Sequence, residues 1–364
     1  MKSFITLEKA SPDFKKYLDG SFSKTQRAVV VESLNLNSNA EAITFEIIEE
    51  DLNQKLVLSE FFSSFLKVYK FIYFLFPIFY ICLTYYINDL TFDPTTTFLA
   101  ILATTFLFIA VNLMSDYWDY MKGLDKIIKC HQSKPLVKGW IQAVRVKQIS
   151  VALMIASLFL GVPIVIAFPK VFGIILFAMV MIYFGLLRND VSYQEYSLGD
   201  LFWGILVGPV LSIGFEMAIG GQAHVHYLFF GMVWGSLIFF KIQLSHFEYL
   251  LAGSLAGVKN LINYFGFENG KKFILFSWLL FLTSFLLFQL SFLHWLICLP
   301  TLGVLGYMTL KSYKGLMDLK SPLGSDLSKV MLSFHQLYIL VVCLWVTQTM
   351  FLFLIKAIQG NIFK

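Results

Sequence analysis

The chain has 364 residues, of which 58% are hydrophobic, 17% aromatic and only 14% charged, and its mean hydropathy is +0.72. A soluble globular domain carries about 25% charged residues, so the composition excludes that class and indicates an integral membrane protein. The net charge of +5 requires no nucleic-acid partner, because lysines that flank membrane helices produce the same excess.

Residues 1–62 differ in character from the rest of the chain. The stretches AVVVESLNLN (28–37) and AITFEIIEED (42–51) predict two short strands with a polar SNAE turn between them. We expect an N-terminal extension that contains a β-hairpin, either as a small cytoplasmic cap or as a partly ordered arm. A membrane domain over residues 63–364 follows it.

Nine apolar segments after the extension approach the roughly 20 residues that a helix needs to cross a bilayer. They predict an all-α integral membrane protein with nine transmembrane helices. Pro300 and Gly303 predict a kink in the eighth helix. The segments span 68–87, 95–114, 148–167, 171–187, 199–217, 226–244, 273–290, 292–309 and 334–356.

Basic residues are distributed unevenly among the connections between these segments. Seven lie between the second and third segments, three between the sixth and seventh, and four between the eighth and ninth, whereas the opposite connections contain only Lys170. The positive-inside rule therefore places the N-terminus in the cytoplasm and the C-terminus outside. We expect a protein of a bacterial-type inner membrane.

An acidic stretch, NLMSDYWDYMKGLD (112–125), follows the second apolar segment. If the helix continues, Asn112, Asp116 and Asp119 share one face, because residues three and four apart are neighbours on a helix. Asp125 follows a glycine and is expected on the next loop. An amide and clustered carboxylates form a hard-oxygen site that suits Mg²⁺ held jointly by the protein and a phosphate group.

Lysines follow the acidic stretch and suit the binding of a diphosphate that departs with negative charge. Spacing alone leaves a second interpretation open, in which these are solvated charges at a helix end and Asp119 pairs with Lys122. The candidates for binding a diphosphate are Asn112, Lys122, Lys126, Lys134 and Lys138.

Three motifs resemble the UbiA family of membrane prenyltransferases, most closely its branch acting on 1,4-dihydroxy-2-naphthoate. The acidic stretch matches the family pattern N-L-x-N-D-Y-x-D-x-x-K-G-x-D at eight positions. The other two motifs are KPLVKGWI (134–141) and SLGDLFWGILVGPVL (197–211). They occur in the family's order, and the resemblance covers residues 65–356.

The resemblance implies a nine-helix bundle with a central cavity open to the cytoplasmic side. It implies Mg²⁺-dependent transfer of a prenyl group from an isoprenoid diphosphate to an aromatic or other lipid-soluble acceptor within the membrane, as in quinone biosynthesis. Asp116, Asp119 and Asp125 then have catalytic roles, and Asp116, Asp119 and Ser115 bind the metal. The expected partners are a polyprenyl diphosphate, a hydrophobic acceptor and membrane lipids, without nucleic acid.

The chain departs from the family pattern in two places. Ser115 stands where the family has an asparagine, and serine is the shorter ligand. In SHFEYLLAGSLAGVKNLINYFG (245–266), Tyr249 and Gly253 occupy the positions of the family's second aspartate pair. Glu248 is the one carboxylate close to that register, one residue away.

The missing second pair leaves three functions open. The first is an altered prenyltransferase, which transfers alkyl or aryl groups other than methyl and relies on the first motif. His246 and Lys241 are further candidates to contact phosphate in this enzyme. A catalytically inactive relative binds a lipid or a partner protein, with residues 1–62 as a docking arm. A transporter fits poorly, because most spans lack charged residues at mid-bilayer depth. We favour the prenyltransferase.

Overall fold

The computed structural model describes residues 3–19, 22–23, 26–31, 41–49, 93–121, 136, 143–183, 199–220, 225–255, 260–292, 295–322 and 325–358. Its contacts divide the chain into two compact units. Unit 1 comprises Met1–Ile72, Thr105–Ser157 and Tyr249–Lys259, and unit 2 comprises Tyr73–Thr104, Leu158–Glu248 and Asn260–Lys364. The expected boundary between the extension and the membrane domain, at residue 62, lies outside the described residues.

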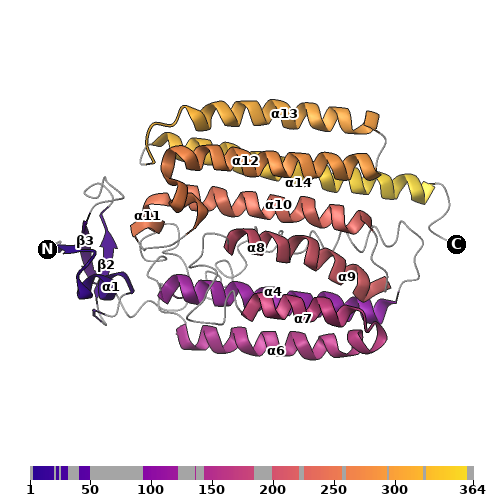
Figure 1. The fold of residues 1–364 in the computed structure, drawn as a ribbon, viewed down its shortest axis with the longest axis horizontal. Coiled ribbons are helices and arrows are strands. Elements are labelled where there is room, and N and C mark those ends of the chain that lie inside the picture. The colour runs from indigo at the N-terminus through magenta and orange to yellow at the C-terminus, as the bar shows by residue number, and fades with distance from the viewer. Residues whose placement is uncertain are drawn as a thin grey trace. The chain divides into compact units, whose positions relative to one another are not determined.

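The N-terminal segment forms a three-stranded antiparallel sheet in the order β1-β3-β2 (Figure 1). Its elements are β1 (Ser3–Glu8), helix α1 (Pro12–Asp19), β2 (Gln26–Val30) and β3 (Ala42–Glu49). The strand β3 lies within the predicted segment 42–51, and β2 overlaps the start of the predicted segment 28–37. The two strands pair from Gln26 opposite Glu49 to Val30 opposite Phe45. The sequence analysis did not predict β1 or α1.

One face of this sheet packs into a core that includes residues from a distant part of the chain. Alternation along β3 buries Ile43 and Phe45, which lie against Phe14 of α1 and Ala28 of β2. Leu251, Ala252 and Leu255 of helix α11 (Leu250–Leu255) belong to the same core. The N-terminal sheet therefore has its hydrophobic core completed by a helix that follows the sixth predicted membrane segment.

Every described element after the N-terminal sheet is a helix. Eight of the nine predicted segments correspond to described helices, and the first, 68–87, lies outside the described residues, so the count of nine stays a prediction. Among the described helices, five spans are long and apolar enough to cross a membrane, at Pro94–Tyr120, Val144–Ala167, Gly199–Ile219, Tyr227–Glu248 and Leu261–Leu290. Besides α11, the helices are α4 (Pro94–Met121), α6 (Ala143–Ala167), α7 (Val171–Ile182), α8 (Gly199–Ile205), the π-helical turn η5 (Leu206–Val210), α9 (Leu211–Gly220), α10 (Val225–Glu248), α12 (Leu261–Phe292), α13 (Trp295–Met317) and α14 (Ser325–Ile358).

Helix α4 begins with a side-chain cap. The backbone N–H of Thr95 donates to Asp93 Oδ1 at 3.0 Å, and the Thr96 hydroxyl donates to the other carboxylate oxygen. The hydrogen bond from Thr96 contributes most to holding the pKa of the Asp93 carboxyl below its usual range, and the backbone hydrogen bond from Thr95 adds to it. The cap fixes the start of the helix whose far end carries the acidic stretch.

In unit 2, α10 contacts α8, η5, α9, α12 and α14 (Figure 1). Its Trp234, Phe230 and Phe240 are fully buried, and the ring of Phe240 lies 4.8 Å from that of Trp278 on α12. The mostly apolar composition of residues 225–240 of α10 agrees with this position, because a helix enclosed by its neighbours needs no polar face there.

Four glycines bring η5 and α8 close to α10. A Cβ placed on Gly208 would lie 2.4 Å from the carbonyl oxygen of Gly231, and one placed on Gly235 would lie 2.4 Å from the carbonyl oxygen of Gly204. Such distances leave no room for any side chain. The two backbones therefore touch in the manner of small-residue crossings in membrane proteins.

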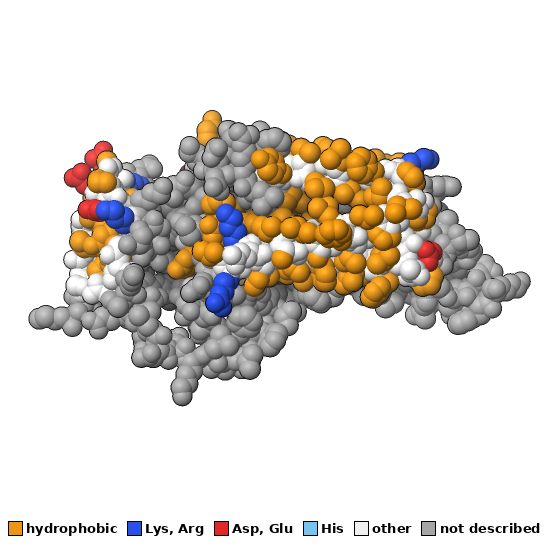
Figure 2. Space-filling view, turned by 90° about the horizontal axis from the view of Figure 1, so that it is seen from below, with side chains coloured by type: hydrophobic (Ala, Val, Ile, Leu, Met, Phe, Trp, Pro, Cys, Tyr) orange, Lys and Arg blue, Asp and Glu red, His pale blue; other side chains and the backbone are white. Residues whose placement is uncertain are grey.

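The described helices expose many large apolar side chains. Ile166 of α6 is 76% exposed and Phe159 of the same helix is 71% exposed. Figure 2 shows hydrophobic side chains over most of the described helical surface on one face. An apolar outer surface of this kind fits contact with lipid.

Candidate functional site

The acidic stretch lies on the last turns of α4, which continues to Met121, beyond the apolar part of the sequence. Asn112, Ser115, Asp116 and Asp119 are in helical conformation and half-buried. The helix brings Asn112, Asp116 and Asp119 to one side, because successive steps of four and three residues return to nearly the same direction.

The remaining predicted site residues lie outside the described part of the chain. Among the described residues, no group of three or more carboxylate, histidine or cysteine side chains is placed to hold a metal ion. The predicted site residues that lie outside the described part of the chain are Lys122, Asp125, Lys126, Lys134 and Lys138.

An adjacent side of α4 fixes the helix within unit 1. Leu113 is buried together with Leu136 and Val146, and Tyr117 and Tyr120 pack against them. The hydroxyl of Ser150 on α6 donates to the carbonyl oxygen of Ala110 at 2.6 Å and is completely buried. Apolar packing and one interhelical hydrogen bond therefore hold the acidic end of α4 against the start of α6.

Asn112 is oriented by its own helix. Its Nδ2 donates to the carbonyl oxygen of Phe108 at 2.9 Å, a step of four residues back along α4. The donor atoms of the amide face the helix, so Oδ1 is the atom that can serve as a ligand.

Lys147 is a site residue that the sequence analysis did not select. It stands near the start of α6, and its Nζ lies 5.6 Å from the ring centroid of Tyr117, two residues from Asp119. A cation over an aromatic face is attracted by the ring, and this contact places positive charge beside the acid-bearing turn. The sequence signal was the lysine itself, which was counted only for membrane orientation.

Unit 2 contains a polar cluster between α8 and α10. Gln243 Nε2 donates to Asp200 Oδ2 at 2.9 Å, and His246 Nδ1 lies 3.1 Å from the same oxygen. Gln243 is completely buried. The motif SLGDLFWGILVGPVL contains Asp200, and a carboxylate near the end of an apolar helix is the kind of residue that marks a functional candidate in the sequence.

The structure places the two phosphate-binding candidates His246 and Lys241 in contacts within unit 2. His246 faces Asp200, and Lys241 Nζ lies 2.9 Å from His335 Nε2 on α14. Both nitrogens thus have partners inside the helix bundle, and α10 ends at Glu248, which is half-buried.

The positions of the missing second aspartate pair contribute to the N-terminal core. Tyr249 packs against the cluster formed by Phe14, Phe45 and α11. Gly253 is buried in α11, and its N–H donates to the Tyr249 carbonyl at 2.7 Å. This segment is apolar because it is packed beneath the N-terminal sheet.

A comparison with protein families matches residues 74–322 to the model of the UbiA prenyltransferase family. No curated protein sequence matches the chain.

Solved structures resemble the fold. A digeranylgeranylglyceryl phosphate synthase is 20% identical, with 83% of this chain and 99% of that chain covered and a TM-score of 0.56. A UbiA homolog from Archaeoglobus fulgidus, bound to DMAPP and Mg²⁺, is 16% identical, with 78% and 96% covered and a TM-score of 0.51. The same homolog bound to GPP and Mg²⁺ has a TM-score of 0.50 at 15% identity, with 78% and 97% covered.

Proposed function

The chain belongs to the UbiA prenyltransferase family, because the family model matches well over half of this chain's residues. From this premise, we propose that the protein transfers a prenyl group within the membrane. The donor is an isoprenoid diphosphate, the acceptor is an aromatic or other lipid-soluble molecule, and the reaction depends on Mg²⁺. The solved UbiA homologs that hold DMAPP or GPP together with Mg²⁺ support the class of donor and the metal.

The observation that carries the proposal is the oxygen-rich face at the end of α4. Asp116 and Asp119 supply carboxylates, Asn112 presents Oδ1 and Ser115 supplies a hydroxyl, all on one rigid helix. These are the hard-oxygen ligands that Mg²⁺ prefers, so the residues present fit the metal. When bound, Mg²⁺ neutralises the diphosphate as it leaves.

The chain's own residues then have distinct tasks. Asp116, Asp119 and Ser115 hold the metal, and Asp125 completes the acidic set. Breaking the allylic C–O bond leaves its electron pair on the diphosphate, which the basic residues retain by charge. The acceptor attacks the allylic carbon and loses one proton, which balances the transfer. The residues proposed to bind the diphosphate are Lys122, Lys126, Lys134, Lys138 and Lys147, the last of which lies over the ring of Tyr117. Asn112, which the sequence also suggested for this role, presents the acceptor Oδ1 and therefore suits the metal instead.

The finer assignments are part of the same proposal and rest on the motif resemblance. Within the family, the chain is most similar to the branch that acts on 1,4-dihydroxy-2-naphthoate in quinone biosynthesis, and nine helices surround a cavity open to the cytoplasm. The protein resides in a bacterial-type inner membrane with its N-terminus inside. It works with a single acidic motif, because Tyr249 packs against the N-terminal core and Gly253 is buried in α11, and neither residue supplies a carboxylate.

The test uses membranes that contain the full chain and a radiolabelled polyprenyl diphosphate. Asp116→Asn and Asp119→Asn should each lower the transfer of label into lipid-extractable product at least 100-fold, because loss of one charge weakens the metal site. Asp326→Asn is the matched control, since that exposed carboxylate pairs with Lys329 at the start of α14. Undiminished transfer by the Asp116 and Asp119 variants would refute the role of the acidic motif.

A catalytically inactive relative that binds a lipid or a partner protein is the second candidate. The observation in its favour is that α11 is apolar and packed where the family has its second carboxylate pair. It differs from the first proposal in one measurable respect, since the inactive relative releases no diphosphate from any donor in the presence of Mg²⁺.

A further inference from the structure

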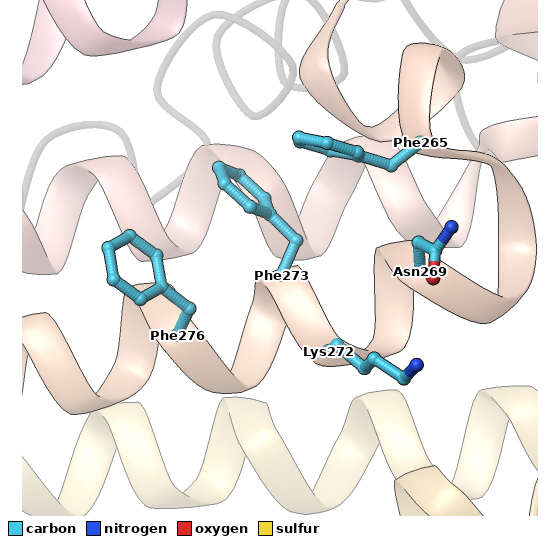
Figure 3. A pocket seen from close by; sticks show the side chains of 5 residues that line it. All are labelled: Phe265, Asn269, Lys272, Phe273 and Phe276. Atoms are coloured by element: carbon cyan, nitrogen blue, oxygen red, sulfur yellow. The ribbon is translucent and has the colours of Figure 1, made fainter.

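An open groove lies at the start of α12, where that helix is sharply bent. Gly266 has φ 71° and ψ −173°, so the turn Leu261–Phe265 leaves the axis of the rest of the helix. A glycine is needed there because this left-handed φ is costly for other residues. The groove has a volume of about 370 Å³ and is lined by Phe265, Asn269, Lys272, Phe273 and Phe276 (Figure 3).

Three phenylalanines form an apolar wall of the groove. The rings of Phe265 and Phe273 lie 5.0 Å apart and those of Phe273 and Phe276 lie 6.0 Å apart. Phe276 is 57% exposed, whereas Phe281 and Phe285 further along the same helix are fully buried. Phe273 is half-buried and its ring lies 6.1 Å from that of Phe239 on α10, so the aromatic row is anchored on the bundle at Phe273 and accessible at Phe276.

The polar end of the groove carries a positive charge that the described protein does not neutralise. Lys271 and Lys272 are adjacent, but Lys271 is buried, and its Nζ contacts Glu268 and the carbonyl oxygen of Leu319, each at 2.9 Å. Glu268, the acid one turn before Lys272, is thus already paired. Lys272 is exposed and has no carboxylate partner among the described residues.

The groove lies where α12 changes from polar to apolar. The residues Glu268–Lys272 read ENGKK, and the sequence from Phe273 onward, FILFSWLLFLTSFLLF, is almost entirely apolar. Aromatic and basic residues at such a change mark the membrane–water interface. Figure 3 shows Asn269 and Lys272 on the side of the groove near Phe265, with Phe276 at the opposite end of the aromatic row.

We propose that this groove is a binding site for an anionic phospholipid. The Lys272 ammonium and the Asn269 amide bind the phosphodiester, and the acyl chain lies against Phe273 and Phe276. One cation suits a singly charged phosphodiester, whereas a diphosphate would need several cations or a metal. The proposal does not depend on prenyl transfer.

The test is native mass spectrometry of the detergent-purified full chain, titrated with phosphatidylglycerol or phosphatidylcholine. We expect the first phosphatidylglycerol to bind more tightly than phosphatidylcholine. Lys272→Gln should weaken phosphatidylglycerol binding roughly five-fold, as expected for one interfacial lysine, without changing phosphatidylcholine binding. Phe276→Ala should weaken the binding of both lipids. Lys329→Gln, at an exposed lysine of α14, should change neither.

Three results would overturn the proposal. Lys272→Gln binding phosphatidylglycerol as tightly as the wild type would exclude the assigned contact, and equal affinity of the wild type for both lipids would exclude recognition of the headgroup charge. If geranyl diphosphate displaces the lipid from the wild type, and displaces it less effectively from Lys272→Gln, the groove binds a diphosphate and not a phospholipid. An unchanged thermal unfolding midpoint in both groove variants is the check on folding, as both side chains are exposed.

Discussion

At the scale of single residues, Lys271 has a structural role that its neighbour Lys272 does not share. Its buried ammonium joins Glu268 on α12 to the carbonyl oxygen of Leu319, just after the end of α13, and lies 5.0 Å from the ring centroid of Phe267. An ammonium that is buried needs such partners, because an unpaired charge in this position is costly. Lys271 therefore ties the two helices together.

Replacing Lys271 tests this role. Lys271→Met leaves the Leu319 carbonyl without its donor and should lower the free energy of unfolding by about 1–3 kcal/mol. Lys272→Met, at the exposed neighbour, should change it by less than about 0.5 kcal/mol. Thermal unfolding of both variants in detergent measures the difference, and equal stability of the two would show that the buried contacts are not needed.

The candidate site was predictable from the sequence where its geometry is local. The common side of Asn112, Asp116 and Asp119 follows from helical spacing alone, provided that α4 continues to Met121, as it does. The contact of Lys147 with Tyr117 was not predictable, because it depends on how α6 packs against α4. The same holds for Asp200 and His246, which are 46 residues apart in the chain and meet through the packing of α8 against α10.

At the scale of helices and strands, the glycine crossing brings the backbones of η5 and α10 into direct contact within unit 2. Gly208→Ala would place a methyl group 2.4 Å from the Gly231 carbonyl oxygen. The helices must separate to admit it, so we expect a loss of about 1–3 kcal/mol of stability. Gly173→Ala on α7 is the control, since no atom lies within 4 Å of its added carbon.

Thermal unfolding of the two alanine variants distinguishes a steric cause from a general effect of replacing glycine. Alanine favours the helix over glycine by about 1 kcal/mol, so Gly173→Ala should be neutral or stabilising. Destabilisation only by Gly208→Ala would agree with close backbone packing. Equal effects of both substitutions would contradict it.

The contact between α11 and the N-terminal sheet predicts how the extension is held. Leu255 is 2% exposed in that core, and Leu255→Asp would bury an unpaired carboxylate, which is unfavourable. We expect residues 1–72 to become sensitive to limited proteolysis in the full chain. Phe4→Asp, on a side chain of β1 that is 54% exposed, should leave the protease resistance unchanged. A resistant Leu255→Asp protein would mean that α11 does not hold the sheet.

The helices were predictable because hydropathy is a local property, and eight predicted segments have described counterparts. The differences arise from longer-range effects. The prediction for the seventh helix begins at residue 273, whereas α12 begins at Leu261 and bends at Gly266. The strand β1 and the short helix α11 were not predictable, because β1 depends on pairing with β3 and α11 on packing in the N-terminal core, and neither contact is local in the sequence.

At the scale of the whole molecule, the N-terminal extension and the family-related part of the chain share one hydrophobic core. The family match begins at residue 74, so the sheet β1-β3-β2 precedes it, whereas α11 lies within it. Unit 1 contains the sheet, the acidic end of α4 and α11. The segment that would carry a second carboxylate pair thus serves the sheet, which leaves the first acidic stretch as the basis of the proposed chemistry.

The most direct test of this account measures diphosphate release by the purified full chain from geranylgeranyl diphosphate, with an acceptor quinol precursor, in the presence and absence of Mg²⁺. The account predicts release with Mg²⁺, loss of release when EDTA removes the metal and its return when Mg²⁺ is restored, and no release by Asp116→Asn. Release that is the same with and without Mg²⁺, or that persists in Asp116→Asn, would contradict the central claim that the acidic face of α4 acts through Mg²⁺ in prenyl transfer.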